Sequence, residues 1–273
     1  MGGAADTITA RPLAGPGGTP AKPQASAAKA TGAGWRIIKF FLALALIPGC
    51  VGLTLGAFDH FFNLSSRLSL SVAGPNTLFR YFIGGVVSFA ILAVLLWRPV
   101  VVYVFGHELV HAMATWMCLG KVSNLAASTT GGQVTTSKSN TFIRLAPYCV
   151  PLYALLAVGT YLALNTWWRP LGGYIQWLAL ALGVFYAFHV GFTLWSLRRD
   201  QPDLKPDGWL FSLVLIYIGN LAIFVLLMGF ICDGQITSAW PALKESALLG
   251  WAHAHHIYQN LGSAATDLVA RFR

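Results

Sequence analysis

The chain has 273 residues, of which 56% are hydrophobic and only 10% are charged, and its mean hydropathy is +0.63. About a quarter of the residues in an ordinary soluble domain are charged, so the composition excludes that class and indicates an integral, multi-pass membrane protein. The net charge of +9 would suggest nucleic-acid binding in a soluble protein. Here the basic residues lie between apolar runs and at the chain ends, where positive-inside topology and anionic lipid headgroups account for them. The expected surroundings are therefore a lipid bilayer, and no nucleic-acid partner is expected.

The first 34 residues are rich in Ala, Gly, Pro, Ser and Thr. Such a segment cannot bury enough apolar surface to order itself, so residues 1–34 are predicted to be a disordered leader on the cytoplasmic side of the membrane. A targeting peptide is the alternative interpretation, but no small-residue cleavage site follows the apolar stretch.

The apolar runs that follow predict an all-α polytopic fold with about five or six transmembrane helices in a domain spanning residues 35–235. The candidate runs cover residues 40–58, 81–97, 100–120, 142–164, 174–197 and 209–231, with a polar connection at 59–78. Pro99 leaves two alternatives open, a tight hairpin between two spans or a broken helix. Pro147 and Pro151 predict an irregular helix start, buried against protein or lining a cavity, because freed backbone groups cannot face lipid.

Two other segments have their own patterns. Residues 121–141 read KVSNLAASTTGGQVTTSKSNT and predict a short β-hairpin or polar loop. An extended edge there could hold a substrate peptide by main-chain hydrogen bonds, and a surface hairpin without a role is the alternative. In residues 236–273, apolar side chains recur at helical spacing from Trp240 to Phe272. That spacing predicts an amphipathic helix that lies on the membrane surface or packs on the bundle.

A His-Glu-x-x-His pattern lies in the run from Val100 to Gly120. On a helix, His107 and His111 are four positions apart and share one face, so both imidazoles can bind one metal ion, and zinc is the expected ion. Glu108 is placed to take a proton from a water at the metal and pass it to a leaving amine. The chain has only two glutamates, and an ionisable cluster in an apolar span costs several kcal/mol unless it is paired or metal-bound. A functional metal site is therefore favoured over hydrogen-bonded core histidines.

A zinc site built from two histidines needs a third protein ligand and leaves the fourth position open. The longer metalloprotease motif is excluded, because Ala114 and Met117 stand where it requires glycine and a third histidine. A downstream glutamate could only be Glu245, which lies in the amphipathic tail. The charged segment 198–208 holds three aspartates, so an aspartate is the best candidate, although such acids also cap helices.

The remaining histidines and the cysteines are weaker candidates. His189 lies in an apolar run, where a lone histidine is more often a hydrogen-bonded core residue than a ligand. Three histidines of the tail are expected on the polar face of its helix, namely His253, His255 and His256. The four cysteines are scattered without Cys-x-x-Cys spacing and are expected to be buried thiols.

The chain resembles the site-2 protease family of intramembrane zinc metalloproteases. Three features carry the resemblance: the His-Glu-x-x-His on a membrane helix, the polar hairpin after it, and an Asp-Gly pair opening a later membrane helix. The resemblance implies that His107 and His111 are zinc ligands, that Glu108 is the general base, and that Asp207, followed by Gly208, is the third ligand. Pro206 stands where the family has leucine, and the family's preceding Asn-Pro pattern is absent.

These departures keep two aspartates in consideration. Asp203 and Asp207 are four apart and would share a helix face if a helix began near Pro202, so either could reach the metal. The substrate implied is a membrane-anchored protein whose helix unwinds locally before cleavage, because helical carbonyls are already paired. The hairpin, Asn140 and Asn220 are candidates for lining a water route and stabilising the oxyanion.

Two functional classes other than a protease are also compatible with parts of the sequence. One is a non-proteolytic metal-binding membrane protein or a subunit of a membrane assembly, which the intact Glu108 disfavours because structural coordination requires no base. The other is a transporter, which is disfavoured because the two halves of the chain show no convincing internal repeat.

Overall fold

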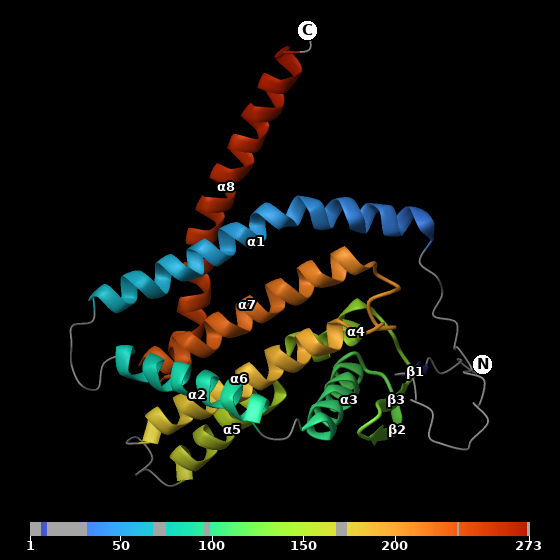
Figure 1. Cartoon of the computed structure of the whole chain (residues 1–273), viewed down its shortest axis with the longest axis vertical. Helices are drawn as coiled ribbons and strands as arrows, with labels where there is room; N and C mark the ends of the chain where they lie inside the picture. The colour runs from blue at the N-terminus through green and yellow to red at the C-terminus, as the bar shows by residue number, and fades with distance from the viewer. Residues whose placement is uncertain are drawn as a thin grey trace.

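The structure is a computed structural model that describes residues 7–9, 32–67, 75–95, 99–167, 174–233 and 235–271. These ranges are mostly helical, and the helices are α1 (Ala33–Arg67), α2 (Pro75–Leu95), α3 (Val100–Met117), α4 (Thr141–Cys149), α5 (Leu152–Trp167), α6 (Ile175–Leu197), α7 (Trp209–Asp233) and α8 (Ala239–Arg271) (Figure 1). Five of these helices are long and apolar enough to cross a membrane, or up to six spans result if the bent pair α4–α5 counts as one. The all-α polytopic fold predicted from the apolar runs is therefore confirmed.

The pair α4 and α5 is the irregular helix start that the two prolines predict. Its helices meet at a bend of 72°. Pro147 lies inside α4, and Pro151 separates the two helices. At Pro99 the sequence leaves open a tight hairpin or a broken helix. Helix α2 ends at Leu95 and α3 begins at Val100, while residues 96–98 lie outside the described residues.

Helix α1 is longer than the apolar run that predicts it. The polar connection expected from residue 59 is wrong as far as Arg67, because the helix continues to that residue; residues 68–74 lie outside the described part of the chain. Polar residues are accepted in this last part of α1 because α8 supplies partners for them. The Nε2 atom of His253 lies 2.7 Å from Oδ2 of Asp59, and Nδ1 of His60 lies 3.4 Å from Oε2 of Glu245.

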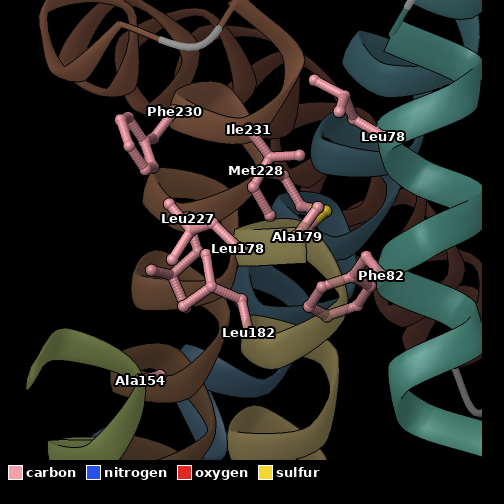
Figure 2. Packing of buried hydrophobic residues seen from close by; sticks show 10 residues of the cluster. All are labelled: Leu78, Phe82, Ala154, Leu178, Ala179, Leu182, Leu227, Met228, Phe230 and Ile231. Carbon is pink, nitrogen blue, oxygen red and sulfur yellow. The ribbon is translucent and has the colours of Figure 1, made fainter. Parts of the chain in front are cut away.

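The main core lies where α2, α5, α6 and α7 meet. Figure 2 shows ten buried side chains of this cluster, with Phe82 of α2 facing Leu182 of α6 and with Met228 and Ile231 of α7 close by. Helices α2 and α6 cross closely because both carry glycine at the crossing. A Cβ atom on Gly85 would lie 2.0 Å from the backbone oxygen of Leu180, so no larger residue fits there without separating the helices.

Helix α8 packs on α1 through a second contact of small residues. A Cβ atom on Gly56 would lie 2.2 Å from the backbone nitrogen of Gly250, and one on Gly52 would lie 2.6 Å from the backbone oxygen of Gly250. This α1–α8 glycine contact decides between the two placements predicted for the tail, because the first part of α8 packs on the bundle. From residue 258 onwards every described residue is exposed, and Figure 1 shows this part of α8 extending away from the other helices.

The predicted β-hairpin is present, and it gains a third strand. Strands β2 (Val122–Ala127) and β3 (Gly132–Thr136) pair antiparallel, and β1 (Thr7–Thr9) pairs antiparallel with the other edge of β3. The strand order is therefore β1-β3-β2. Most of the predicted disordered leader, residues 1–6 and 10–31, lies outside the described residues, but its residues 7–9 form a strand.

Candidate metal centre

Two histidines and one aspartate come together in the interior. Helix α3 carries His107 and His111 one turn apart, and Asp203 comes from the connection between α6 and α7. The Oδ2 atom of Asp203 lies 3.7 Å from Nε2 of His107 and 3.5 Å from Nε2 of His111. Within the described ranges, these three are the His, Cys, Asp or Glu side chains whose ligand atoms all lie within 4.8 Å of one another. The group can hold a metal ion.

The ring of His111 is fixed in the orientation that a ligand requires. It is 1% exposed, and its Nδ1 atom lies 2.8 Å from the backbone oxygen of Ile143. A proton on Nδ1, donated to that carbonyl, leaves the Nε2 lone pair free toward Asp203. The carbonyl is itself held in place, because Asn140 caps α4 by accepting a hydrogen bond from the backbone N–H of Ile143.

Asp203 is held in place by a hydrogen bond to its side chain and by the burial of the residue that follows it. Tyr148 donates a hydrogen bond of 2.9 Å to Oδ2 of Asp203, and the ring centroids of Tyr148 and His107 are 4.9 Å apart. The next residue, Leu204, is fully buried in a cluster with Tyr148 and Ile216. A ligand on a non-helical connection is thus positioned by the core beneath it.

The carboxyl of Asp203 is ionised, as a metal ligand must be. Burial alone would raise its pKa, but the electrostatic interaction with the imidazoles of His111 and His107 lowers the pKa well below its usual range. The same carboxylate that compensates the buried imidazoles is therefore available to a cation.

Glu108 lies beside this group without belonging to it. Its residue is 3% exposed, and the first residue of β3 covers it. A Cβ atom on Gly132 would lie 2.5 Å from Cγ and 2.6 Å from Oε1 of Glu108, so only glycine lets the strand approach the carboxylate this closely. A cavity of about 240 Å³ is lined by Glu108, the three ligand candidates and residues 129–132 of the hairpin.

The hairpin therefore lines the cavity, as the sequence predicts, but the two asparagines do not. Asn140 acts as the cap of α4 described above. Asn220 donates hydrogen bonds of 2.8 Å to the backbone oxygens of Tyr148 and Ile216. Neither asparagine is among the cavity-lining residues, so the structure contradicts a lining role for them.

Asp207, the ligand implied by the resemblance, lies in a different environment. It is 1% exposed; Lys39 of α1 contacts its Oδ1 atom, Thr141 donates to Oδ1 at 2.9 Å, and Arg144 donates to Oδ2 at 2.5 Å. We call Asp207, Lys39, Arg144 and Thr141 the Asp207 ion cluster. Both carboxylate oxygens are engaged in it, and the structure brings Asp203 rather than Asp207 to the histidines.

The local backbone structure explains why Asp203, and not Asp207, lies beside the two histidines. The two aspartates would share a helix face only if a helix began near Pro202, but α7 begins at Trp209 and the preceding residues form turns. The sequence held a signal for the ion cluster, since Lys39 directly precedes one apolar run, Arg144 lies within another, and buried charges are normally paired. Sequence reasoning did not connect either of them with Asp207.

The other histidines lie outside the ligand group. His189 is buried on α6 and shares a small separate cavity with His107. On α8, His253 pairs with Asp59, while His255 and His256 are exposed. None of the four cysteines, all within the described residues, forms a disulfide; Cys50 is buried as expected, whereas Cys118, Cys149 and Cys232 are only half-buried.

In comparisons with protein-family models, curated proteins and solved structures, no match to this chain was found.

Proposed function

We propose that the protein is an intramembrane zinc metalloprotease that hydrolyses peptide bonds in or near the transmembrane segments of membrane-anchored proteins. One observation carries the proposal: a buried glutamate lies directly beside a His, His, Asp group and faces the same cavity without being part of that group. A purely structural metal site requires no such carboxylate.

The side chains present suit zinc. Two imidazoles and one carboxylate make the three-ligand set typical of catalytic zinc, in which the fourth position stays open. The hydrogen bond from His111 to a backbone carbonyl is the outer contact that zinc-binding histidines usually make. A zinc ion held by His107, His111 and Asp203 supplies Lewis acidity, which lowers the pKa of water and polarises a peptide carbonyl.

Glu108 performs the proton transfers of the proposed reaction. Its carboxylate accepts a proton as the water oxygen bonds to the carbonyl carbon of the substrate, and it returns that proton to the amide nitrogen as the C–N bond breaks. Gly132 helps to fix the carboxylate at the cavity by its close approach. The low exposure of Glu108 keeps bulk water away from this transfer.

The substrate reaches this cavity as an extended segment. The carbonyl groups of an intact helix are already hydrogen-bonded, so a transmembrane helix must unwind before one of its bonds can be cut. The hairpin residues that line the cavity lead into β3, whose main chain can pair with an extended peptide. Membrane-anchored proteins with easily unwound helices are the expected substrates.

The test is the variant Glu108→Gln, which keeps the size of the side chain and removes the base. We expect bound zinc to stay at the wild-type level and cleavage of a co-expressed membrane-anchored substrate to fall about 10²–10⁴-fold. The matched control is Glu245→Gln, which changes the only other glutamate of the chain and should cleave normally. Cleavage by Glu108→Gln at the wild-type rate would refute Glu108 as the base and the mechanism built on it, whereas zinc binding without any cleavage by the wild type would leave a non-proteolytic metal protein.

A further inference from the structure

Strand β3 is paired along both edges, and its two partners come from distant parts of the sequence. On one edge lies β2, which belongs to the same hairpin. On the other lies β1, in the register Thr7 with Thr135, Ile8 with Val134 and Thr9 with Gln133. The second edge of β3 is therefore covered by residues from the start of the chain (Figure 1).

This pairing leads toward the cavity of the candidate metal centre. Since β1 runs antiparallel to β3, its last residue, Thr9, is the one nearest to Gly132. Gly132 in turn lies against the Glu108 carboxylate. A chain that follows β1 in this direction is thus led to the carboxylate proposed as the base.

The edge that β1 covers has the properties of a peptide-binding edge. Residues 133–135 of β3 pair with β1 along this edge, and an unpaired strand edge is a template for another extended chain. Val134, at the middle of the register, is fully buried, and β3 also packs against α3. Residues 7–9 read Thr-Ile-Thr, β-branched residues that favour an extended backbone.

We propose that residues 7–9 occupy the β3 edge opposite β2 in cis, as a strand that competes with an extended peptide substrate for that edge. The part that concerns a substrate rests on the proposed function; the occupation of the edge does not. A tethered strand competes at an effective concentration on the order of 1 mM. If the tethered strand binds the free edge with an intrinsic Kd of about 0.1 mM, any peptide that needs the same edge binds the full chain about tenfold more weakly.

A disulfide experiment tests the register in the full chain. We expect Thr9→Cys combined with Gln133→Cys to form a crosslink under mild oxidation, detected by mass spectrometry of the linked peptides. The control combines Thr9→Cys with Ala126→Cys, since Ala126 is the partner of Gln133 on β2. Strands two positions apart in a sheet are separated by about 10 Å, which a disulfide does not bridge. Equal crosslinking in both pairs would overturn the proposal.

A binding experiment tests the competition without requiring catalysis. The probe is a fluorescent synthetic peptide with the sequence of residues 1–14, and its binding is measured by anisotropy to the Glu108→Gln protein with and without residues 1–10. We expect about tenfold tighter binding after the deletion. Binding should be lost with a probe carrying Ile8→Pro, because proline cannot donate a ladder hydrogen bond. Equal binding to both proteins would overturn the proposal.

The two proposals fail in different ways. If the edge is occupied in cis and the protein is a protease, the deletion also raises cleavage of a membrane-anchored substrate, and the Thr9–Gln133 crosslink lowers it. If crosslinking and peptide binding are as expected but neither the wild type nor any variant cleaves a substrate, the proposed protease activity is wrong and the proposed strand-binding edge is supported. If the protein cleaves its substrate but neither the deletion nor the crosslink changes the rate, the proposal that residues 7–9 compete for the edge is wrong, and the proposed protease activity is supported.

Discussion

Asp203 and Asp207 are both almost fully buried, yet the groups around them differ, so one carboxylate is available to a metal ion and the other is engaged in ion pairs. Asp203 faces two imidazoles, which are neutral ligands when a metal is bound and leave the carboxylate free to coordinate. Asp207 faces two fixed cations and a hydroxyl, which engage both of its oxygens. We therefore assign Asp203 to the metal and Asp207 to the attachment of α1.

Substitution of the three aspartates of the 198–208 segment tests this assignment. Asp203→Asn removes a charged ligand, and we expect its zinc affinity to fall by more than about 100-fold, since loss of even an outer contact costs 10–100-fold. Asp207→Asn should retain zinc. Asp200→Asn is the matched control, because its side chain is 74% exposed and pairs only with Lys205 among the described residues. The measurement is zinc content after dialysis against graded chelator, and zinc loss in Asp207→Asn alone would reverse the assignment.

The Asp207 ion cluster also predicts how stability depends on pH. Burial alone would raise the pKa of Asp207, but hydrogen bonds from Lys39, Arg144 and Thr141 lower it below the ordinary value of 3.8. A lowered folded-state pKa stabilises the fold above pH 3.8 and loses that contribution as the pH falls through the folded value. Asp207→Asn leaves two buried cations uncompensated, so we expect a loss of about 3–5 kcal/mol at neutral pH.

Thermal unfolding in detergent between pH 3 and 7 measures this difference. The gap between wild type and Asp207→Asn should be largest at neutral pH and should begin to shrink below about pH 4, where this carboxyl becomes protonated in the unfolded chain but still ionises in the folded one. A gap that stayed constant across this range would show that the charge of Asp207 does not stabilise the fold.

At the scale of residues, spacing predicts some contacts and not others. The pairing of His107 with His111 follows from helix geometry alone, because the two lie four positions apart on a strongly apolar run. The choice of Asp203 depends on turns between α6 and α7 and on Leu204 in the core beneath them. No local pattern encodes that packing, so the sequence left two aspartates open.

At the scale of elements, apolar length predicted helices well and their ends less well. Helix α1 passes its apolar run because Asp59 and His60 find partners on α8, a contact between residues almost two hundred positions apart. Strand β1 has only three residues, too few for an alternating pattern, and its partner strand is equally remote. Elements that depend on distant partners are the ones that local periodicity misses.

The α1–α8 glycine contact gives a test at this scale. Gly56→Leu would place a side chain where Cβ already lies 2.2 Å from the backbone of Gly250. We expect a loss of at least about 1–3 kcal/mol on thermal unfolding and faster proteolysis of α8. Gly262→Leu is the control, since nothing lies within 4 Å of that position, and leucine there favours the helix by up to about 1 kcal/mol. Equal effects of the two substitutions would mean that α8 is not held by this contact.

At the scale of the whole molecule, several charged segments gather at the end of the bundle that holds the metal centre. Arg36 of α1 donates a hydrogen bond of 2.6 Å to the backbone oxygen of Lys205, and Lys39 joins the Asp207 ion cluster. The start of α1 and the 198–208 segment therefore lie together. Basic residues favour the cytoplasmic side, so we predict that this end of the bundle is cytoplasmic.

Cysteine labelling with a membrane-impermeant maleimide tests the orientation. Ser123→Cys, on the exposed face of β2, should label in inside-out vesicles and not in right-side-out ones. Tyr174→Cys, at the opposite end of α6 and 55% exposed, should label in the reverse pattern, and the wild-type chain corrects for its own four thiols. Labelling of Ser123→Cys from the outside would place the metal centre on the other side.

The length of α1 has a consequence for the metal centre. Its 35 residues extend about 52 Å at 1.5 Å per residue, whereas the hydrocarbon layer of a bilayer is about 30 Å thick, so a helix of this length tilts to match the layer. Lys39, near its first turns, is anchored to Asp207 only four positions beyond Asp203. The tilt of α1 in the bilayer and the position of the segment that carries Asp203 are therefore linked mechanically through this ion pair.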